Sequence, residues 1–223
     1  MTSNVIATLN KIKDLEIFKD EFYFVGGTAL SYFINHRISE DIDIVSSKIL
    51  DYRKIIPFMI NVGAKKVDDE NIMSLRLAGL FPDEYILKFT LDNVKIEFFF
   101  ANRPIQKDIL KKLTFTNFEN SNLKILDLKS IIKLKLVALF QRDKSRDLFD
   151  FGSILDNKII TINEILDIAK EVKNITSKEE LINFISNKKE SKNDEAVYLD
   201  ESNRLDLSFE DIKQQVLNKI NNY

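Results

Sequence analysis

The chain has 223 residues, a formal net charge of −2, 44% hydrophobic residues and no cysteine. That length is enough for one large domain or two small ones with buried cores. The absence of cysteine excludes disulfide bonds, thiolate metal sites and a cysteine nucleophile. No apolar run approaches the roughly 20 residues that span a bilayer, and the N-terminal residues lack a signal peptide's apolar core. We therefore expect a cytoplasmic protein that does not contact a membrane.

Positive charge is concentrated in the middle of the chain. The near-neutral total argues against indiscriminate nucleic-acid binding by the whole molecule. Residues 124–146, however, carry a net charge of +5, whereas residues 147–223 carry −6. The basic segment could guide an RNA, or it could be the solvated face of a helix.

The first 45 residues combine helical and strand-like patterns. Residues 4–19 space their apolar side chains at helical intervals. "FYFVGG", residues 22–27, predicts a buried strand that enters a tight turn. Residues 28–35 return to a helical period, and we expect Thr28 to be the N-cap of that helix. "DIDIV", residues 41–45, alternates polar and apolar side chains and predicts a strand.

The next segments predict further strands. Residues 51–66 are typical of a helix followed by a loop, and three strands are expected at 72–80, 84–91 and 94–100. The turn pair Asp92-Asn93 would close the last two strands into a hairpin. The sheet is expected to end near residue 105.

The remainder of the chain has helical periodicity. Capping-box spacings occur at Thr176 to Glu179 and at Ser208 to Asp211. Residues 186–206 are polar and predict a long connection. The predicted fold class is therefore α+β, with a mixed sheet flanked by helices in residues 1–115 and a C-terminal helical bundle domain in residues 116–223.

The first candidate site is the Asp-x-Asp of residues 41–43. Asp41 and Asp43 lie on one face of a strand, so both carboxylates can reach the same cation, Mg²⁺ or Mn²⁺. A third carboxylate is usually needed, and Glu97 is the best candidate because it alternates with two apolar neighbours, Ile96 and Phe98. Alternating acids on a surface strand would give the same pattern without binding a metal.

The second candidate is the glycine pair at the predicted strand-to-helix turn. Gly26 and Gly27 would let a phosphate approach the backbone, and the first N–H groups of the following helix favour an anion. The dinucleotide and P-loop fingerprints are both absent. The alternative is a tight turn with no ligand.

The third candidate is the basic segment "KLVALFQRDKSRDLFD". Lys135 and Arg142 lie on one face of a predicted helix, and Arg146, Asp147 and Asp150 follow. The cations could bind a triphosphate. A buried Arg–Asp network that pins two domains together would contain the same residue types.

The loop before Asp41 contains His36, Arg37 and Ser39. His36 is interpreted as a loop histidine without a catalytic role. Arg37 and Ser39 could orient the Asp-x-Asp strand or contact a phosphate.

The sequence "GGTALSYFINHRISEDIDI" is similar to the first motif of the AbiEii/AbiGii-type nucleotidyltransferases, and "KLVALFQRDKSRDLFDF" resembles their later motif. The resemblance implies a DNA-polymerase-β-like nucleotidyltransferase core followed by a helical domain. Many members of that family are toxins of bacterial toxin–antitoxin or abortive-infection systems, and some modify the acceptor end of tRNA.

The resemblance also implies roles for particular residues. Asp41, Asp43, Lys135 and Asp150 would be catalytic, with metal held by Asp41, Asp43 and Glu97. Glu97 stands where an aspartate is often expected. The residues expected to bind the nucleotide are Gly26, Gly27, Thr28, Arg37, Ser39, Lys135, Arg142, Arg146 and Asp147.

We therefore expect a Mg²⁺-dependent enzyme that binds a nucleoside triphosphate between its two domains and transfers a nucleoside monophosphate to a hydroxyl, with tRNA or another RNA as the acceptor and an antitoxin as a partner. Two enzymatic alternatives are transfer to a protein hydroxyl and kinase-like phosphoryl transfer. A third alternative is a nucleotide-binding interaction module without catalysis.

Overall fold

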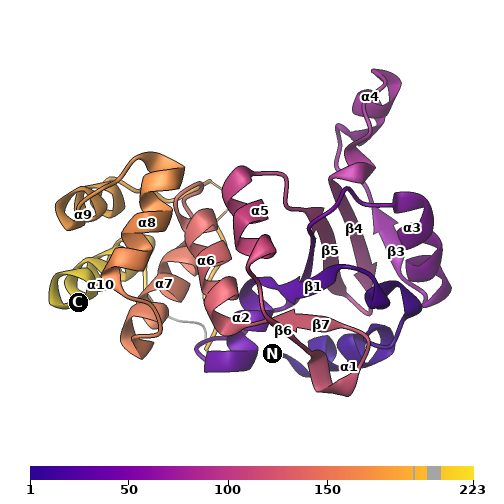
Figure 1. Ribbon diagram of the computed structural model, residues 1–223, viewed down its shortest axis with the longest axis horizontal. Coiled ribbons are helices and arrows are strands. Elements are labelled where there is room, and N and C mark those ends of the chain that lie inside the picture. Colours follow the sequence, from indigo (N-terminus) through magenta and orange to yellow (C-terminus); the bar gives the residue numbers. More distant parts are fainter. Residues whose placement is uncertain (193, 200–206) are drawn as a thin grey trace. The chain divides into compact units, whose positions relative to one another are not determined.

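The computed structural model describes residues 1–192, 194–199 and 207–223 (Figure 1). Contacts within the chain divide it into two compact units. The first consists of Met1–Phe33 and Ser39–Asp127, and the second consists of Ile34–Ile38 and Leu128–Tyr223.

The first unit is built on a mixed sheet. In the described part of the chain the sheet has seven strands in the order β3-β4-β5-β2-β1-β7-β6. The pairs β1–β7 and β2–β5 are parallel and the other pairs are antiparallel, which confirms the predicted mixed sheet. The strands are β1 (Phe22–Val25), β2 (Asp41–Ser46), β3 (Lys65–Val67), β4 (Ile86–Leu91), β5 (Val94–Phe100), β6 (Phe115–Asn117) and β7 (Lys124–Leu126).

An aromatic cluster lies in the core of this unit. The ring of Phe98, on β5, stacks on Phe18 with centroids 6.1 Å apart and meets the edges of Phe22 and Phe89. Helix α1 packs against β2 and β5. The helices of this unit are α1 (Ser3–Ile12), α2 (Gly26–Ile34), α3 (Tyr52–Asn61), α4 (Ile72–Leu77) and α5 (Pro104–Lys111).

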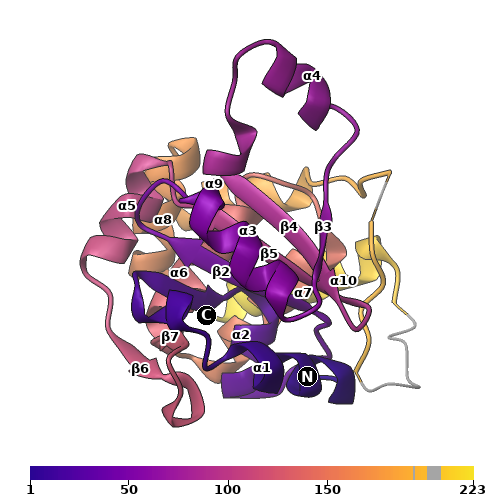
Figure 2. The same cartoon turned by 90° about the vertical axis from the view of Figure 1, so that its right-hand side faces the viewer.

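The predicted strand at residues 72–80 is wrong, because Ile72–Leu77 forms helix α4. The sheet position beside β4 is occupied by β3 instead. Figure 2 shows α4 standing away from the sheet, and Leu77 is 84% exposed. Residues 4–19 also differ from prediction, since α1 ends at Ile12 and a 3₁₀ helix follows at Glu16–Lys19.

The sheet continues beyond residue 115, where we expected the helical domain to begin. Strands β6 and β7 pair with each other, and β7 adds to β1. The division by contacts consequently falls between Asp127 and Leu128.

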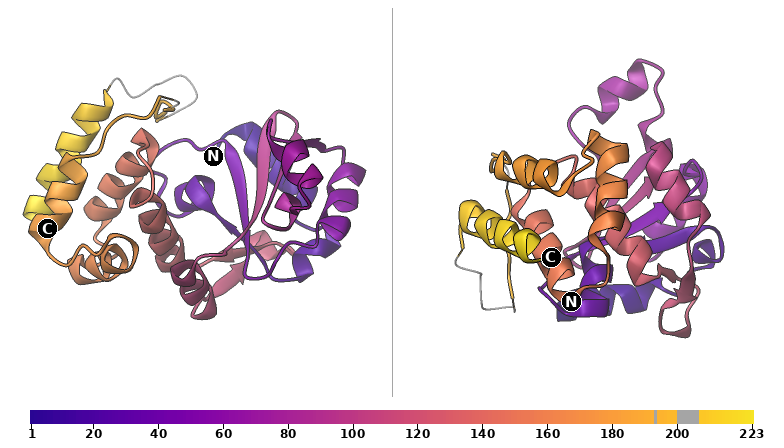
Figure 3. Two further views of the ribbon diagram at one scale, coloured as in Figure 1. Left: turned by 90° about the horizontal axis from the view of Figure 1, so that it is seen from above. Right: turned by 60° about the vertical axis from the view of Figure 1, so that its left-hand side comes forward.

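The second unit is a bundle of helices, as predicted for the C-terminal part of the chain. Helix α7 packs between α6 and α10, and α9 contacts α8 and α10 (Figure 3). The helices are α6 (Leu128–Leu139), α7 (Ser145–Asn157), α8 (Ile162–Lys173), α9 (Lys178–Ser186) and α10 (Phe209–Asn222).

The predicted helix caps are partly correct. Ser208 and Asp211 form the predicted capping box of α10. The other prediction is wrong by one residue, because Ser177 caps α9 by accepting from the N–H of Glu180. A further capping box, Thr161 with Glu164, begins α8 and was not predicted.

Within the predicted connection 186–206, residue 193 and residues 200–206 lie outside the described part of the chain. None of the helices in the described residues combines the length and apolar character needed to cross a membrane.

Candidate active site

The turn from β1 into α2 places a glycine directly against an aspartate. Val25, the last residue of β1, is paired with Asp43 of β2. Gly26 follows with a φ of +81°, a conformation that side chains other than glycine rarely adopt. A Cβ at Gly26 would lie 1.9 Å from Oδ2 of Asp43. This close approach requires glycine at position 26, and it brings the Asp43 carboxylate to the N-terminus of α2.

Three carboxylates share one face of the sheet. Along β2, Ile42 and Ile44 are buried whereas Asp41 and Asp43 are partly exposed, as predicted. Glu97 of β5 is paired with Asp43 in the parallel β2–β5 register and is likewise partly exposed. Neighbouring strands lie about 4.8 Å apart, so the three side chains emerge close together.

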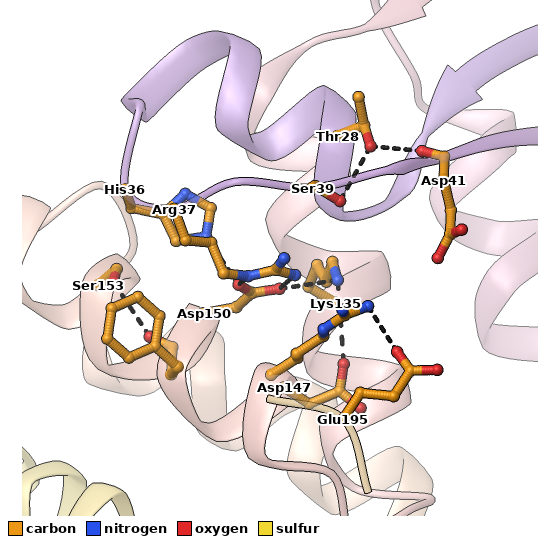
Figure 4. Close-up of polar contacts among 12 residues, drawn as sticks. Thr28, His36, Arg37, Ser39, Asp41, Lys135, Asp147, Asp150, Ser153 and Glu195 are labelled. Carbon is orange, nitrogen blue, oxygen red and sulfur yellow. Dashed lines mark hydrogen bonds and ion pairs between the residues drawn. The ribbon is translucent and has the colours of Figure 1, made fainter. Parts of the chain in front are cut away.

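Thr28 holds the beginning of β2. Its hydroxyl contacts both the hydroxyl oxygen of Ser39, at 2.9 Å, and the carbonyl oxygen of Asp41 (Figure 4). Thr28 is fully buried and Ser39 nearly so. The prediction that Thr28 is the N-cap is wrong, because α2 already begins at Gly26. Thr28 instead fixes the backbone that carries Asp41.

The donor set fits a hard divalent cation such as Mg²⁺. Mg²⁺ takes oxygen ligands and is usually bound by one or two carboxylates together with water and substrate phosphates. Among residues 1–192, 194–199 and 207–223, no group of three or more His, Cys, Asp or Glu side chains is already gathered to hold a metal ion. Asp41 and Asp43 fit the pattern in which the protein supplies two carboxylates and the substrate completes the coordination.

Substituting Gly26 tests the contact with Asp43. We expect Gly26→Ala to reduce any nucleotidyl transfer by about 10²-fold, because the new methyl group displaces the Asp43 carboxylate by an ångström or more. The matched control is Gly79→Ala, where φ is +76° and a Cβ would meet nothing within 4 Å. Both variants carry similar backbone strain, which thermal unfolding would measure. Equal activity of the two folded variants would contradict the predicted role of the contact.

In the second unit, the carboxylate of Asp150 is surrounded by donors. Arg37 donates to Oδ1 from Nε at 2.6 Å and to Oδ2 from Nη2 at 3.1 Å. Lys135 Nζ lies 2.8 Å from Oδ2, and His36 Nε2 lies 2.7 Å from Oδ1. The Asp150 side chain is only 1% exposed.

The environment of Asp150 keeps it ionised. Burial opposes ionisation, but the charges of Arg37 and Lys135 and the hydrogen bonds from His36 and Arg37 outweigh it. Together they hold the pKa of Asp150 well below its usual range.

Asp147 lies one turn before Asp150 on α7 and completes the cluster. Arg142 donates to its two oxygens at 2.6 and 3.1 Å, and Lys135 Nζ lies 3.9 Å from Oδ1. Figure 4 shows Lys135, Asp147 and Asp150 directed toward one another. Lys135 and Arg142 therefore converge on one carboxylate. Their predicted placement on one helix face is wrong, because α6 ends at Leu139 and Arg142 lies in the loop that follows.

Two residues in and beside this cluster were given no role from the sequence. His36, interpreted as a loop histidine without a role, is buried against Asp150 and stacks on Phe149 with ring centroids 6.2 Å apart. Lys188 donates to the Arg142 carbonyl at 2.8 Å and to Asp143 at 2.7 Å, which fixes the α6–α7 loop. Burial lowers the pKa of Lys188. Only the three-dimensional contacts reveal either residue.

The predicted site residues thus form two groups. The first unit brings together Gly26, Gly27, Thr28, Ser39, Asp41, Asp43 and Glu97. The second unit holds Arg37, Lys135, Arg142, Arg146, Asp147 and Asp150. The Arg–Asp network foreseen as an alternative exists, and it lies within the second unit.

Comparison with known proteins identifies the family of the chain. A family model described as "Nucleotidyl transferase AbiEii toxin, Type IV TA system" matches residues 10–216. An uncharacterized protein of Aquifex aeolicus is 27% identical over 163 residues, which cover 73% of this chain and 71% of the relative.

Two solved structures share the fold at low sequence identity. A candidate nucleotidyltransferase of Helicobacter pylori superimposes with a TM-score of 0.51 at 16% identity, covering 99% of this chain and 95% of that one. MenT4, a nucleotidyltransferase toxin of Mycobacterium tuberculosis, gives a TM-score of 0.52 at 12% identity, covering 97% and 79%. The family match over residues 10–216 is the stronger result. On that basis the chain belongs to the AbiEii nucleotidyltransferase toxin family.

Proposed function

We propose that this nucleotidyltransferase uses Mg²⁺ or Mn²⁺ to transfer a nucleoside monophosphate from a nucleoside triphosphate to a hydroxyl group of RNA, with tRNA as the preferred acceptor. The observation that carries the proposal is the Asp43 carboxylate held against Gly26 at the start of α2. Asp41 and Glu97, on the same face of the sheet, supply further oxygen ligands. A phosphate-binding turn and metal ligands in such proximity are what nucleotidyl transfer requires.

In the proposed reaction the oxygen of the acceptor hydroxyl forms a bond to the α-phosphorus of the triphosphate. The bond from that phosphorus to the oxygen that bridges it to the β-phosphorus breaks, pyrophosphate leaves, and the hydroxyl proton passes to solvent. Asp41 and Asp43, with Glu97, would hold the cation. When bound, the cation neutralises charge on the phosphates and favours ionisation of the acceptor hydroxyl.

The chain's own residues would contribute binding and orientation. The backbone N–H groups of Gly26 and Gly27, at the N-terminus of α2, are suited to bind phosphate oxygens. Thr28 fixes the backbone from which the Asp41 side chain extends. We assign Lys135, Arg142 and Arg146 of the second unit to contacts with phosphate groups.

The proposed RNA acceptor and biological role rest on charge and on family membership. Residues 124–146 carry a net charge of +5, which favours a polyanion. The matching family is described as a toxin of type IV toxin–antitoxin systems. We therefore propose that the protein acts in the cytoplasm as a toxin with an antitoxin partner.

The decisive experiment follows the label from each α-³²P-labelled nucleoside triphosphate in a mixture of Mg²⁺, total cellular RNA and total cellular protein. Label is expected in the tRNA fraction. EDTA is expected to abolish it, as is the double variant Asp41→Asn/Asp43→Asn. A parallel reaction with γ-labelled triphosphate detects kinase-like transfer.

Each outcome distinguishes one alternative. If label from the α-labelled nucleotide enters protein, the acceptor is a protein hydroxyl and not RNA. Label transferred only from the γ-labelled nucleotide would show phosphoryl transfer. Tight nucleotide binding without transfer in any fraction would favour a non-catalytic binding module.

A further inference from the structure

An acidic segment of the chain contacts the beginning of α7. Residues 194–196, which we call the acidic strap, lie about 50 positions beyond the residues that they touch. Helix α7 receives no side-chain cap from Lys144, its N-cap residue. The backbone N–H of Ser145 donates instead to both carboxylate oxygens of Asp194, at 3.1 Å each, and the Ser145 hydroxyl donates to Asp194 as well.

The other two residues of the acidic strap bind the neighbouring arginine. Glu195 Oε2 lies 2.5 Å from Nη1 of Arg146 (Figure 4 labels Glu195), and the carbonyl oxygen of Ala196 accepts from Arg146 Nε at 3.2 Å. Val197, the next residue, is buried, and the carbonyl of Tyr198 accepts from the N–H of Ile38 at 2.8 Å. The acidic strap is thus held both by its charged side chains and by its backbone.

The acidic strap supplies the charge that a bound polyanion would supply. The three cations assigned above to phosphate contacts are Lys135, Arg142 and Arg146, and the same unit holds Arg37, Asp147 and Asp150 beside them. Asp194 and Glu195 add two negative charges beside these groups. A carboxylate on a helix N-terminus and a carboxylate on an arginine are also the contacts that phosphate oxygens make.

We propose that the acidic strap is an autoinhibitory element, in which the Asp194 and Glu195 carboxylates occupy positions that phosphate groups of the substrates take when they bind. This inference rests on the proposed function, because the phosphate groups that the acidic strap would exclude belong to the proposed substrates. Phosphate binding and the present strap contacts exclude each other, so the acidic strap would lower the affinity of the resting protein for its anionic substrate.

The test compares Asp194→Asn/Glu195→Gln with wild type in binding a fluorescent single-stranded RNA oligonucleotide and, separately, a non-hydrolysable nucleoside triphosphate, each over a range of salt concentrations. We expect the double variant to bind one of these two ligands, the one whose phosphate competes with the acidic strap, about tenfold more tightly. A tenfold gain in affinity corresponds to about one charge-assisted contact. If the ligand is RNA, the salt dependence should steepen by about 0.7 in log K against log salt, because Arg146 gains one phosphate. The two arms show whether the phosphate belongs to RNA or to the nucleotide.

Three further variants make the result specific. Asp167→Asn/Glu171→Gln makes the same change in charge at exposed positions of α8 in the same unit and should leave affinity unchanged. Adding Arg146→Met to the strap variant should cancel the gain. Glu195→Gln alone retains the Asp194 cap of α7, so it tests competition even if the double variant is destabilised.

The proposal is overturned if the strap variants bind both ligands no more tightly than wild type, or if the α8 control tightens binding equally. Failure of the proposed function gives a different result. In that case no label is transferred to RNA, while the strap variants still bind a phosphate ligand more tightly.

Discussion

Replacing Asp150 by asparagine is expected to lower the free energy of unfolding by about 3 to 5 kcal/mol, the cost of removing one partner from a buried ionic group. The Asp150 side chain is 1% exposed and accepts from Arg37, and it lies against Lys135 and His36. In Asp150→Asn the amide NH₂ would face other donors, and the buried guanidinium and ammonium groups would lose their negative partner. Urea-induced unfolding, followed by far-UV circular dichroism, measures the change.

The same carboxylate predicts how stability depends on pH. The pKa of Asp150 is held well below the usual 3.8 in the folded protein, so unfolding makes this group easier to protonate. Its contribution to stability is complete above about pH 4 and is lost as the pH falls through the lower pKa of the folded state. Wild-type stability should therefore decline on acidification below about pH 4, and the decline should be smaller in Asp150→Asn.

The matched control for this prediction is Asp156→Asn on the same helix. Asp156 is 56% exposed and pairs with Lys219 Nζ at 2.6 Å. An exposed ion pair of this kind contributes about 0 to 1 kcal/mol. Equal losses in Asp150→Asn and Asp156→Asn would show that the buried cluster provides no net stabilisation.

The second large effect is expected at Asp43. Asp43→Asn should reduce nucleotidyl transfer by on the order of 10³-fold, because it removes the charge that we propose holds the cation while it preserves the shape of the side chain. The packing of Asp43 against Gly26 should survive, so the melting temperature should change little. Transfer rates and Mn²⁺ affinity, the latter by electron paramagnetic resonance, would both be measured.

Asp92→Asn is the control for Asp43→Asn. Asp92 lies in the β4–β5 turn of the same unit, is 45% exposed and has a φ of +51°, which asparagine tolerates. The Asp92→Asn variant should retain full activity and full Mn²⁺ affinity. If Asp43→Asn also retained both, Asp43 would not be a metal ligand.

Glu97→Gln addresses the third carboxylate in the same assay. A loss of Mn²⁺ affinity close to that of Asp43→Asn would assign Glu97 as a ligand. If the Mn²⁺ affinity is unchanged, Asp41 and Asp43 would be the protein's carboxylate ligands and Glu97 would not be one.

Local patterns in the sequence predicted the part of the site that is local in the chain. The alternation in "DIDIV" places Asp41 and Asp43 on one face because strand periodicity depends on neighbouring residues alone. Gly26 marks the turn into α2 because its positive φ disfavours other residues. The family motifs linked these features to nucleotidyl transfer, and the match over residues 10–216 confirmed the predicted family.

Prediction failed where short elements depend on distant partners. The alternating apolar residues of 72–80 are typical of a strand, yet β3, with only three residues, occupies the position beside β4. All three residues of strand β6 are exposed, so their burial does not alternate along the strand. Both assignments depend on pairing across the sheet rather than on local preference.

The contacts of the second unit's cluster were also beyond local reasoning. Arg37 and Asp150 are 113 residues apart in the chain, and Ser145 and Asp194 are 49 apart. The residue types were compatible with either a substrate site or a structural network. The sequence alone could not show that His36 belongs to the cluster around Asp150. Likewise, nothing in the polar segment 186–206 indicates that Asp194 caps α7.

The membership of Ile34–Ile38 in the second unit has a consequence for the order in which the protein is made and folds. All residues of the first unit have been synthesised once the chain reaches Asp127, whereas the second unit needs both this early five-residue segment and the last part of the chain. The sheet can therefore fold first during translation, and the segment must wait for α7. Closing a contact over 113 residues is slow, and a fragment that begins at Leu128 would lack Arg37 and His36 altogether. The bundle is consequently not an independently excisable domain, because its buried ionic cluster includes a piece of chain taken from between two elements of the sheet unit.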